Sequence, residues 1–230
     1  MKQILFLLIL VAACNTAFAF DKEKQAILLD LRACEKCDLT NADLKNANLE
    51  RAEIDYIDMS NANVEGANFN FAHMDEVILN GVKAQGASFK GAYMHHSEFD
   101  NAVFEKTIFR GADLSKGKFR DIKATGADFS NAILKYTKWK NAILVNALFK
   151  STILHRADFE NANLEGANFE NADLWDADFT NSKLTGANFK GASLKLADQP
   201  DRHISANLYK SCKELTDAGA LIDDKTKCQR

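Results

Sequence analysis

Residues 157–176 read ADFENANLEGANFENADLWD, and their pattern decides the fold. A small residue, a polar residue, a large apolar residue and two further, mostly polar residues recur in that order, so the period is five. An α-helix has a hydrophobic period of about 3.6 residues and a strand a period of about 2, so neither element explains the pattern. A repeat of this kind is typical of a solenoid, in which each repeat stacks on its neighbours.

The frame continues far beyond this stretch without an insertion. Large apolar residues occupy every fifth position from Leu39 to Leu194, with Ala84 and Ala124 as exceptions. Two places before most of them stands a small residue, usually alanine, with a few departures such as Ile57 and Val77. Positions that lie twenty apart share their chemistry, since one such set holds seven phenylalanines: Phe69, Phe89, Phe109, Phe129, Phe149, Phe169 and Phe189. We therefore expect residues twenty apart to be stacked neighbours, with these rings forming a ladder in the core.

Blocks such as Ala42–Asn46 and Ala167–Asn171 resemble the repeats of the pentapeptide repeat family. The resemblance covers residues 37–196 and implies an all-β solenoid, a right-handed quadrilateral β-helix with four blocks to a coil. About eight coils at a spacing of ~4.8 Å give a rod of roughly 38 Å. The ends of a solenoid expose unpaired strand edges. We therefore expect short helical caps at both ends: an N-terminal capping helix over residues 20–36, and a helical cap with a disulfide-pinned tail over residues 197–230, including a helix from His203 to Leu215.

The N-terminal segment predicts export. Residues 1–3 form a short basic start, residues 4–13 are apolar throughout, and residues 17–19 have the small-x-small pattern of a cleavage site. Residues 1–19 are therefore expected to be a signal peptide. A second interpretation stays open, because Val11–Cys14 resembles a bacterial lipobox in which Cys14 would be lipidated. Either route predicts a periplasmic, secreted or membrane-anchored protein. By resemblance to signal-bearing members of the family in photosynthetic cells, a thylakoid lumen is a further alternative.

Four cysteines follow the expected signal peptide, and an even number in an exported chain indicates two disulfides. Their grouping favours a pair before the repeats, Cys34 with Cys37, and a pair after them, Cys212 with Cys228. The alternative is that Cys34 and Cys37 form a redox motif or part of a metal site.

Surface histidines offer a second alternative site. The metal-ligating candidates are His73, His95 and His96, with Glu53 or Asp75 as a further ligand. No nucleophile–base–acid set and no phosphate-binding loop stands out in the sequence. We therefore expect no enzyme activity, no catalytic residue, no metal and no cofactor.

The charge balance argues against nucleic acid as a partner, because 29 basic residues face 32 acidic ones and the net charge is −3. The best-known members of the pentapeptide repeat family imitate duplex DNA and act on DNA gyrase, so that role remains a remote alternative. On the side that holds Phe99, the outward charges alternate by coil: Glu98 and Asp100, Lys118 and Arg120, Lys138 and Lys140, Asp158 and Glu160. This alternation indicates either ion pairs between coils or a basic band that a partner recognises.

Outward apolar residues predict a partner surface between residues 133 and 153. The candidate residues are Ile133, Tyr136, Lys138, Lys140, Ile143, Val145, Leu148 and Ile153. A contiguous patch of this kind marks an interface. The alternative is that β-branched residues simply suit a strand face and that the band wraps too many sides to be contiguous.

Together these features predict a non-enzymatic, exported scaffold or protein-binding rod of the bacterial envelope. Its lateral surface is expected to contact a protein partner, as a monomer or an end-to-end dimer. Membrane contact is expected only through a lipidated Cys14.

Overall fold

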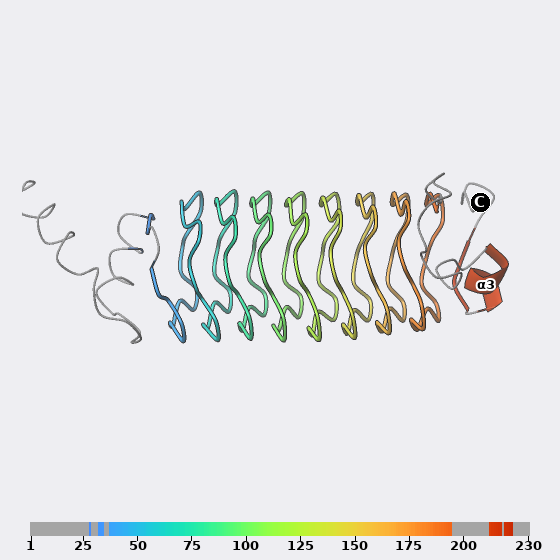
Figure 1. The fold of residues 1–230 in the computed structure, drawn as a ribbon, viewed down its shortest axis with the longest axis horizontal. Coiled ribbons are helices and arrows are strands. Elements are labelled where there is room, and N and C mark those ends of the chain that lie inside the picture. The colour runs from blue at the N-terminus through green and yellow to red at the C-terminus, as the bar shows by residue number, and fades with distance from the viewer. Residues whose placement is uncertain (1–27, 29–31, 35–36, 195–211, 218, 223–230) are drawn as a thin grey trace, which may run out of the picture.

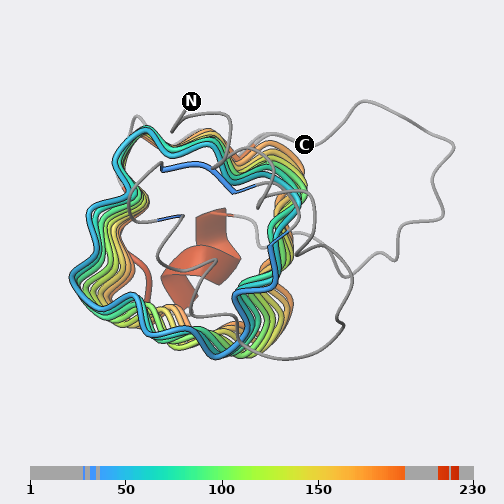
Figure 2. The same ribbon diagram turned by 90° about the vertical axis from the view of Figure 1, so that its left-hand side faces the viewer.

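A computed structural model of residues 1–230 describes residue 28 and the ranges 32–34, 37–194, 212–217 and 219–222. Figure 1 shows a rod of stacked coils, with the helix α3, Cys212–Asp217, beyond its C-terminal coil. Viewed along the rod, the coils superimpose as a roughly square ring, and α3 projects inside its outline (Figure 2). The fold is therefore a solenoid β-helix. Within the described ranges, no helix has the length and apolar character needed to cross a membrane.

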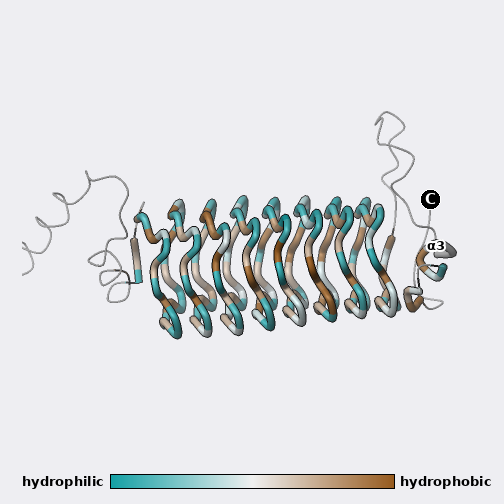
Figure 3. The backbone as a smooth tube through the Cα atoms, turned by 90° about the horizontal axis from the view of Figure 1, so that it is seen from below, coloured by the Kyte–Doolittle hydropathy of each residue, from teal (hydrophilic) through white to brown (hydrophobic). Residues whose placement is uncertain are grey.

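Parallel backbone pairing at an offset of twenty residues holds the coils together. Asp58, for example, bridges Asp38 in the preceding coil and Ile78 in the following one. The Leu44 amide donates to the carbonyl oxygen of Asn63 at 2.7 Å, and the Asn63 amide donates to that of Ala42 at 2.8 Å. Each block contributes a single bridging residue between two turns, so the described coils contain bridges rather than long strands. Hydrophobic and polar segments accordingly recur from coil to coil in Figure 3.

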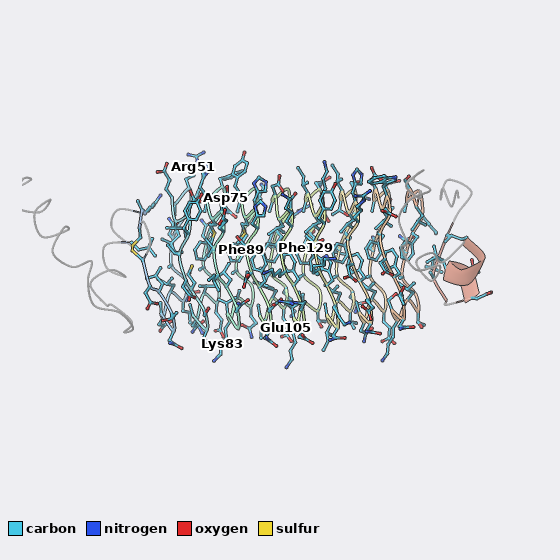
Figure 4. The ribbon with its side chains drawn as sticks, in the orientation of Figure 1. Arg51, Asp75, Lys83, Phe89, Glu105 and Phe129 are labelled. Carbon is cyan, nitrogen blue, oxygen red and sulfur yellow. A yellow bond between two sulfur atoms is a disulfide. The ribbon has the colours of Figure 1, made fainter. Side chains whose placement is uncertain are left out.

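The bridging residues define four sides of the rod. Side A carries residues 33, 53 and onward to 193; side B carries 38 to 178; side C carries 43 to 183; and side D carries 48 to 188, each at intervals of twenty. Because the chain passes through the sides in this order, side A lies opposite side C, and side B opposite side D. In Figure 4, Asp75, which follows side A, lies at one long edge of the rod, and Lys83 on side C lies at the other.

Aromatic side chains fill much of the interior. The rings of the phenylalanine ladder are fully buried and nearly parallel, with centroids 4.9 Å apart between Phe69 and Phe89 and 5.1 Å apart between Phe89 and Phe109. A second aromatic column meets the ladder edge to face, as Trp139 does Phe129 at 86°. The Trp139 indole N–H donates to the Thr137 hydroxyl at 2.7 Å, so the largest core side chain keeps a hydrogen-bond partner. Figure 4 shows Phe89 and Phe129 between the two long edges.

The chain turns at each edge through a residue in the left-handed backbone region. From Asn41 to Gly191, every fifth residue has a positive φ, for example 59° at Asn41 and 67° at Gly111. Asparagine and glycine tolerate this conformation best, which explains their frequency in the fifth position of the block. Tyr56 and Tyr136 occupy the same position with φ of 60° and 61°. The sequence analysis did not identify this requirement, although the frequency of these two residue types was its signal.

The N-terminal end differs from the expected helix over residues 20–36. Ala33 already pairs with Glu53, and the Cys34 amide donates to the Glu53 carbonyl at 3.2 Å, so pairing begins inside that range. Leu28 is helical and buried in the core, and most of the remaining range lies outside the described residues. Cys34 and Cys37 are joined by a disulfide with Cα atoms 5.8 Å apart, and both are buried.

The C-terminal end contains a return of the chain that the sequence analysis did not predict. Leu215 of α3 is buried against the core, and Leu221 then pairs in parallel with Asn188. The Phe189 amide donates to the Leu221 carbonyl at 2.8 Å, and the Leu221 amide donates to that of Ala187 at 2.7 Å. This return therefore covers part of the open sheet edge on side D.

Several predictions about the ends fall outside the described residues. The helix expected over 203–215 overlaps α3 only from residue 212, and α3 continues to Asp217. The signal peptide of residues 1–19 and the bond between Cys212 and Cys228 involve positions that the structure does not describe. The right-handed winding, the number of coils and the helical caps also stay predictions.

The left-handed edge position predicts a contrast at Gly111. No atom lies within 4 Å of a Cβ placed on Gly111, so a substitution there changes the backbone preference and meets no obstruction. We expect Gly111→Asn to leave the free energy of unfolding nearly unchanged, and Gly111→Val to lower it by about 1–2 kcal/mol, because a β-branched residue disfavours positive φ. Urea unfolding of both variants measures this, and equal stability of the two would contradict the assignment.

Candidate interaction surface

The eight residues of the predicted partner surface do not form one patch. Residues 133 and 153 are bridged neighbours on side A, so the segment between them passes once around the rod. The structure places Ile133 and Ile153 on side A, Tyr136 at the A–B edge, Lys138 on side B, Lys140 at the B–C edge, Ile143 on side C, Val145 at the C–D edge and Leu148 on side D. The band therefore wraps all four sides, as the alternative interpretation held.

The A–B edge holds the most concentrated group of side chains suited to binding. The Arg156 guanidinium carbon lies 4.8 Å from the centroid of the Trp175 ring and 5.9 Å from that of Tyr136. Its Nε donates to Asp176 Oδ2 at 3.1 Å, and only 8% of Asp176 is exposed. His155 meets the Trp175 ring edge to face at 5.5 Å. Two rings and a buried carboxylate therefore hold Arg156 in place.

Two aliphatic residues adjoin this group. Ile133 and Ile153 are half-buried and bridge each other on side A, and Tyr136 is 44% exposed at the adjoining edge. Tyrosine, tryptophan and arginine are the residues that most often dominate the energetics of protein interfaces. We call the five residues the A–B cluster: Ile133, Tyr136, Ile153, Arg156 and Trp175.

Sequence reasoning identified three members of the A–B cluster and missed two. Arg156 and Trp175 do not belong to the apolar band between residues 133 and 153. The offset of one coil could have found both, because Arg156 follows Tyr136, and Trp175 follows His155, by twenty residues. The outward charges had been compared between coils, but the outward apolar and aromatic residues had not.

The histidines of the described rod also lie on side A or at the A–B edge. His95 Nε2 lies 2.8 Å from Asp113 Oδ2, and His155 Nε2 lies 2.7 Å from Asp173 Oδ2. Each of these pairs joins an edge histidine to an aspartate on side A of the next coil. The His73 ring instead stacks on Tyr93 at 4.9 Å.

The candidate metal site is not assembled in the described part of the chain. No three histidine, cysteine, aspartate or glutamate side chains there come close enough to hold a metal ion. This applies to His73, His95 and His96 with Glu53 or Asp75. Of these, His95 Nδ1 lies 3.7 Å from Asp75 Oδ1, whereas His73 stacks on Tyr93.

Six cations occupy two adjacent coils on side B and its edges. We call them the basic band: Lys116, Lys118, Arg120, Lys135, Lys138 and Lys140. Four of them pair with acidic residues of the flanking coils, in the pairs Lys118–Glu98, Arg120–Asp100, Lys138–Asp158 and Lys140–Glu160. The ion pairs that the alternating charges indicated are therefore present. Exposed pairs of this kind contribute roughly 0.2–1 kcal/mol each.

These pairs shift ionisation in the direction that favours the charged forms. The hydrogen bond from Lys118 holds the pKa of the Glu98 carboxyl below its ordinary value of 4.5. The hydrogen bond to Glu160 raises the pKa of Lys140. Burial alone would raise the pKa of Asp113, but hydrogen bonds from Ser115 and His95 outweigh it, so that the pKa is lowered.

The repeats match a known family. The family model described as "Pentapeptide repeats" matches in eight copies, over residues 34–70, 57–95, 87–123, 127–166 and 162–198. No match was found among curated proteins.

Solved structures of pentapeptide repeat proteins also align with the chain. HetL, involved in heterocyst differentiation regulation in the cyanobacterium Nostoc sp. strain PCC 7120, is 22% identical over 76% of this chain and 98% of that one, with a TM-score of 0.32. Full-length QnrB1, a plasmid-mediated fluoroquinolone resistance protein, is 15% identical over 84% and 94%, with a TM-score of 0.38. A protein of the Arabidopsis thaliana thylakoid lumen is 28% identical over 52% and 68%, with a TM-score of 0.27. Because these scores are low, the family assignment rests on the repeats.

The lowered pKa of Glu98 predicts a pH-dependent contribution to stability. A carboxyl whose pKa is lower in the folded state stabilises the fold above its ordinary value of 4.5 and loses that contribution as pH falls through the folded value. We expect Glu98→Gln to reduce the free energy of unfolding at pH 7 by up to about 1 kcal/mol and to have little effect near pH 3. Urea unfolding at both pH values measures this, with the edge residue Glu105→Gln as control. A loss of stability that is equal at both pH values would contradict it.

Proposed function

Since this chain belongs to the pentapeptide repeat family, we propose that it is a non-enzymatic, protein-binding rod of the bacterial envelope. The observation that carries the proposal is the A–B cluster, in which Arg156 lies against Trp175 and Tyr136 at the surface. Tyrosine, tryptophan and arginine side chains that are held together at a surface are typical of the residues that dominate the binding energy of an interface. Its place on one side of the rod leaves the other sides free for further contacts.

The interior of the rod favours binding over catalysis. The ladder phenylalanines and the alanines beside them are buried along the described coils, so side chains occupy the space that a substrate would need. A partner therefore meets the lateral surface, whose side chains stand out from a regular backbone frame. Rigid presentation of this kind lowers the entropy cost of binding.

The rival functions have less support. Cys34 and Cys37 are each only 7% exposed, which hinders the attack that thiol exchange requires. A rod that imitates DNA needs a continuous acidic surface, whereas side B carries the basic band in its middle.

Export is the part of the proposal that rests on sequence alone. The basic start, the apolar run and the small-x-small pattern within residues 1–19 support cleavage after Ala19. The lipobox-like Val11–Cys14 supports the alternative, a rod tethered to a membrane by a lipidated Cys14.

The intact mass of the mature protein tests export directly. After alkylation without reduction, we expect the mass of Phe20–Arg230 less four hydrogens, with no alkyl group added, because both cysteine pairs are expected to be oxidised. A mass that begins at Cys14 with acyl chains would establish the tethered form. An unprocessed N-terminus would contradict export, and alkylation of Cys34 and Cys37 would favour the redox alternative.

Binding by the A–B cluster predicts unequal effects of two tyrosines in the same backbone position. Tyr56 and Tyr136 both occupy the left-handed position of the A–B edge, but only Tyr136 contacts Arg156. We expect Tyr136→Asn and Trp175→Ser each to weaken partner binding by about 30-fold, as the loss of roughly 2 kcal/mol does, while Tyr56→Asn has little effect.

The partner for this measurement is identified by cross-linking to the exported chain, then purified, and its Kd for each variant is measured by calorimetry. Asparagine occupies the left-handed position at many edges, and Ser115 stands in the column of Trp175, so the variants suit the backbone. Thermal unfolding confirms that each variant is folded. Equal affinity of all three variants and the unchanged protein would overturn the proposed site.

A further inference from the structure

We propose that the basic band recognises an acidic segment of the protein partner, which crosses side B beside the A–B cluster. The inference rests on the proposed function and adds the chemistry of the partner. It starts from the arrangement of the six cations, which occupy three regions on two adjacent coils: the A–B edge, side B and the B–C edge.

The two coils of the basic band are direct neighbours. Lys118 bridges Lys138, and the Lys116 amide donates to the Lys135 carbonyl at 2.7 Å. Adjacent coils stand ~4.8 Å apart, so the cations of the two coils are neighbours along the rod, with Lys118 paired toward the preceding coil and Lys138 toward the following one. Like charges that lie directly opposite each other between strands are destabilising, and a ligand that supplies carboxylates relieves that repulsion.

The counter-charges of the band lie outside it, in the flanking coils, and they leave the cations exposed. The acidic partners of Lys118 and Arg120 belong to the preceding coil, and those of Lys138 and Lys140 to the following one. The four cationic side chains remain 45–55% exposed, and the Lys138–Asp158 pair spans 3.5 Å. A carboxylate of a partner can therefore bind the same cations from the solvent side.

Two lysines of the band have no ion pair in the described structure, namely Lys116 and Lys135. Both lie at the A–B edge, where Lys116 and Tyr136 occupy the same column in successive coils. An acidic residue, Asp121, lies at the B–C edge of the band, away from these two lysines, and accepts a hydrogen bond from Asn141 at 3.0 Å. The two lysines of the band that have no ion pair therefore lie beside Tyr136 of the A–B cluster.

The flanking coils decide between kinds of anionic ligand. Along the rod, side B and its B–C edge present an acidic row, two basic rows and another acidic row, the outer rows being Glu98 with Asp100 and Asp158 with Glu160. A long polyanion that lies along the rod meets both acidic rows, which are well within the Debye length of ~10 Å. A short acidic peptide that runs across the rod contacts the two basic rows, with Asp121 at their B–C edge, and does not lie over the acidic rows. The charge pattern therefore favours an acidic protein segment over a nucleic acid or a sulfated glycan.

A peptide experiment tests the inference on the mature, full-length protein. The probe is a capped, fluorescein-labelled hexaglutamate peptide, and its binding is followed by fluorescence anisotropy. We expect binding that weakens as salt rises from about 20 mM to about 200 mM, because the contacts are between exposed charges. We expect the double variant Lys116→Asn with Lys135→Gln to bind the peptide about fivefold more weakly.

A matched control removes the same charge from the other side of the rod. Lys106 occupies the left-handed position of the C–D edge with φ of 56°, and Lys83 lies on side C. The double variant Lys106→Asn with Lys83→Gln therefore changes the net charge equally and is expected to bind the peptide almost as the unchanged protein does. An equal loss in both double variants, or a heparin oligosaccharide that binds more tightly than the peptide, would overturn recognition of an acidic segment.

The same variants distinguish this inference from the proposed function. If the purified partner loses affinity with Trp175→Ser but keeps it with the Lys116–Lys135 variant, the A–B cluster stands and the acidic segment is refuted. If neither change affects its affinity, both are refuted. If both changes weaken binding and the Lys106–Lys83 control does not, the partner uses the two surfaces together.

Discussion

The coil length of twenty residues is the constraint on which the rest of the structure depends. Each coil satisfies its backbone groups by pairing with residues twenty positions away, and it can do so only if the chain turns through a left-handed residue at every fifth position. One inserted residue would move every later side chain to a wrong position. The uninterrupted frame from Leu39 to Leu194 shows that the chain keeps this register throughout.

This register explains which features the sequence could predict. Inner residues are set by volume, because Phe109 must stack between Phe89 and Phe129, and their pattern was readable as columns. The pairing of Leu221 with Asn188 could not be predicted from the sequence. It is made by backbone groups, and a single pairing outside the repeats leaves no pattern of side chains. The predicted partner surface included Tyr136 but not Arg156. It was chosen from consecutive residues around one coil, whereas the neighbour of Tyr136 lies twenty positions further along the chain.

The column arrangement also makes the sides of the rod independent. A side chain on side B meets its neighbours one coil away, as Lys140 meets Glu160 at 3.0 Å, and not the residues of side D. Bulky edge residues follow the same rule, because the ring of Phe71 lies over Gly91, where a Cβ would stand only 2.7 Å from it. A surface can therefore change on one side while the core and the other sides remain as they are.

The bridging position of each block, which Asp58 and Asp113 occupy, shows where a substitution on the surface has a cost. An aspartate or asparagine there usually accepts the amide two residues on, as Asp58 does from Ser60 at 2.8 Å and Asp113 from Ser115 at 3.1 Å. An isoleucine gives up that hydrogen bond and leaves apolar surface in water. On sides C and D, a charged residue separates the aliphatic ones, whereas Ile133 and Ile153 are direct neighbours on side A. Two consecutive losses beside Tyr136 and Arg156 are better explained by a partner that covers them than by the fold alone.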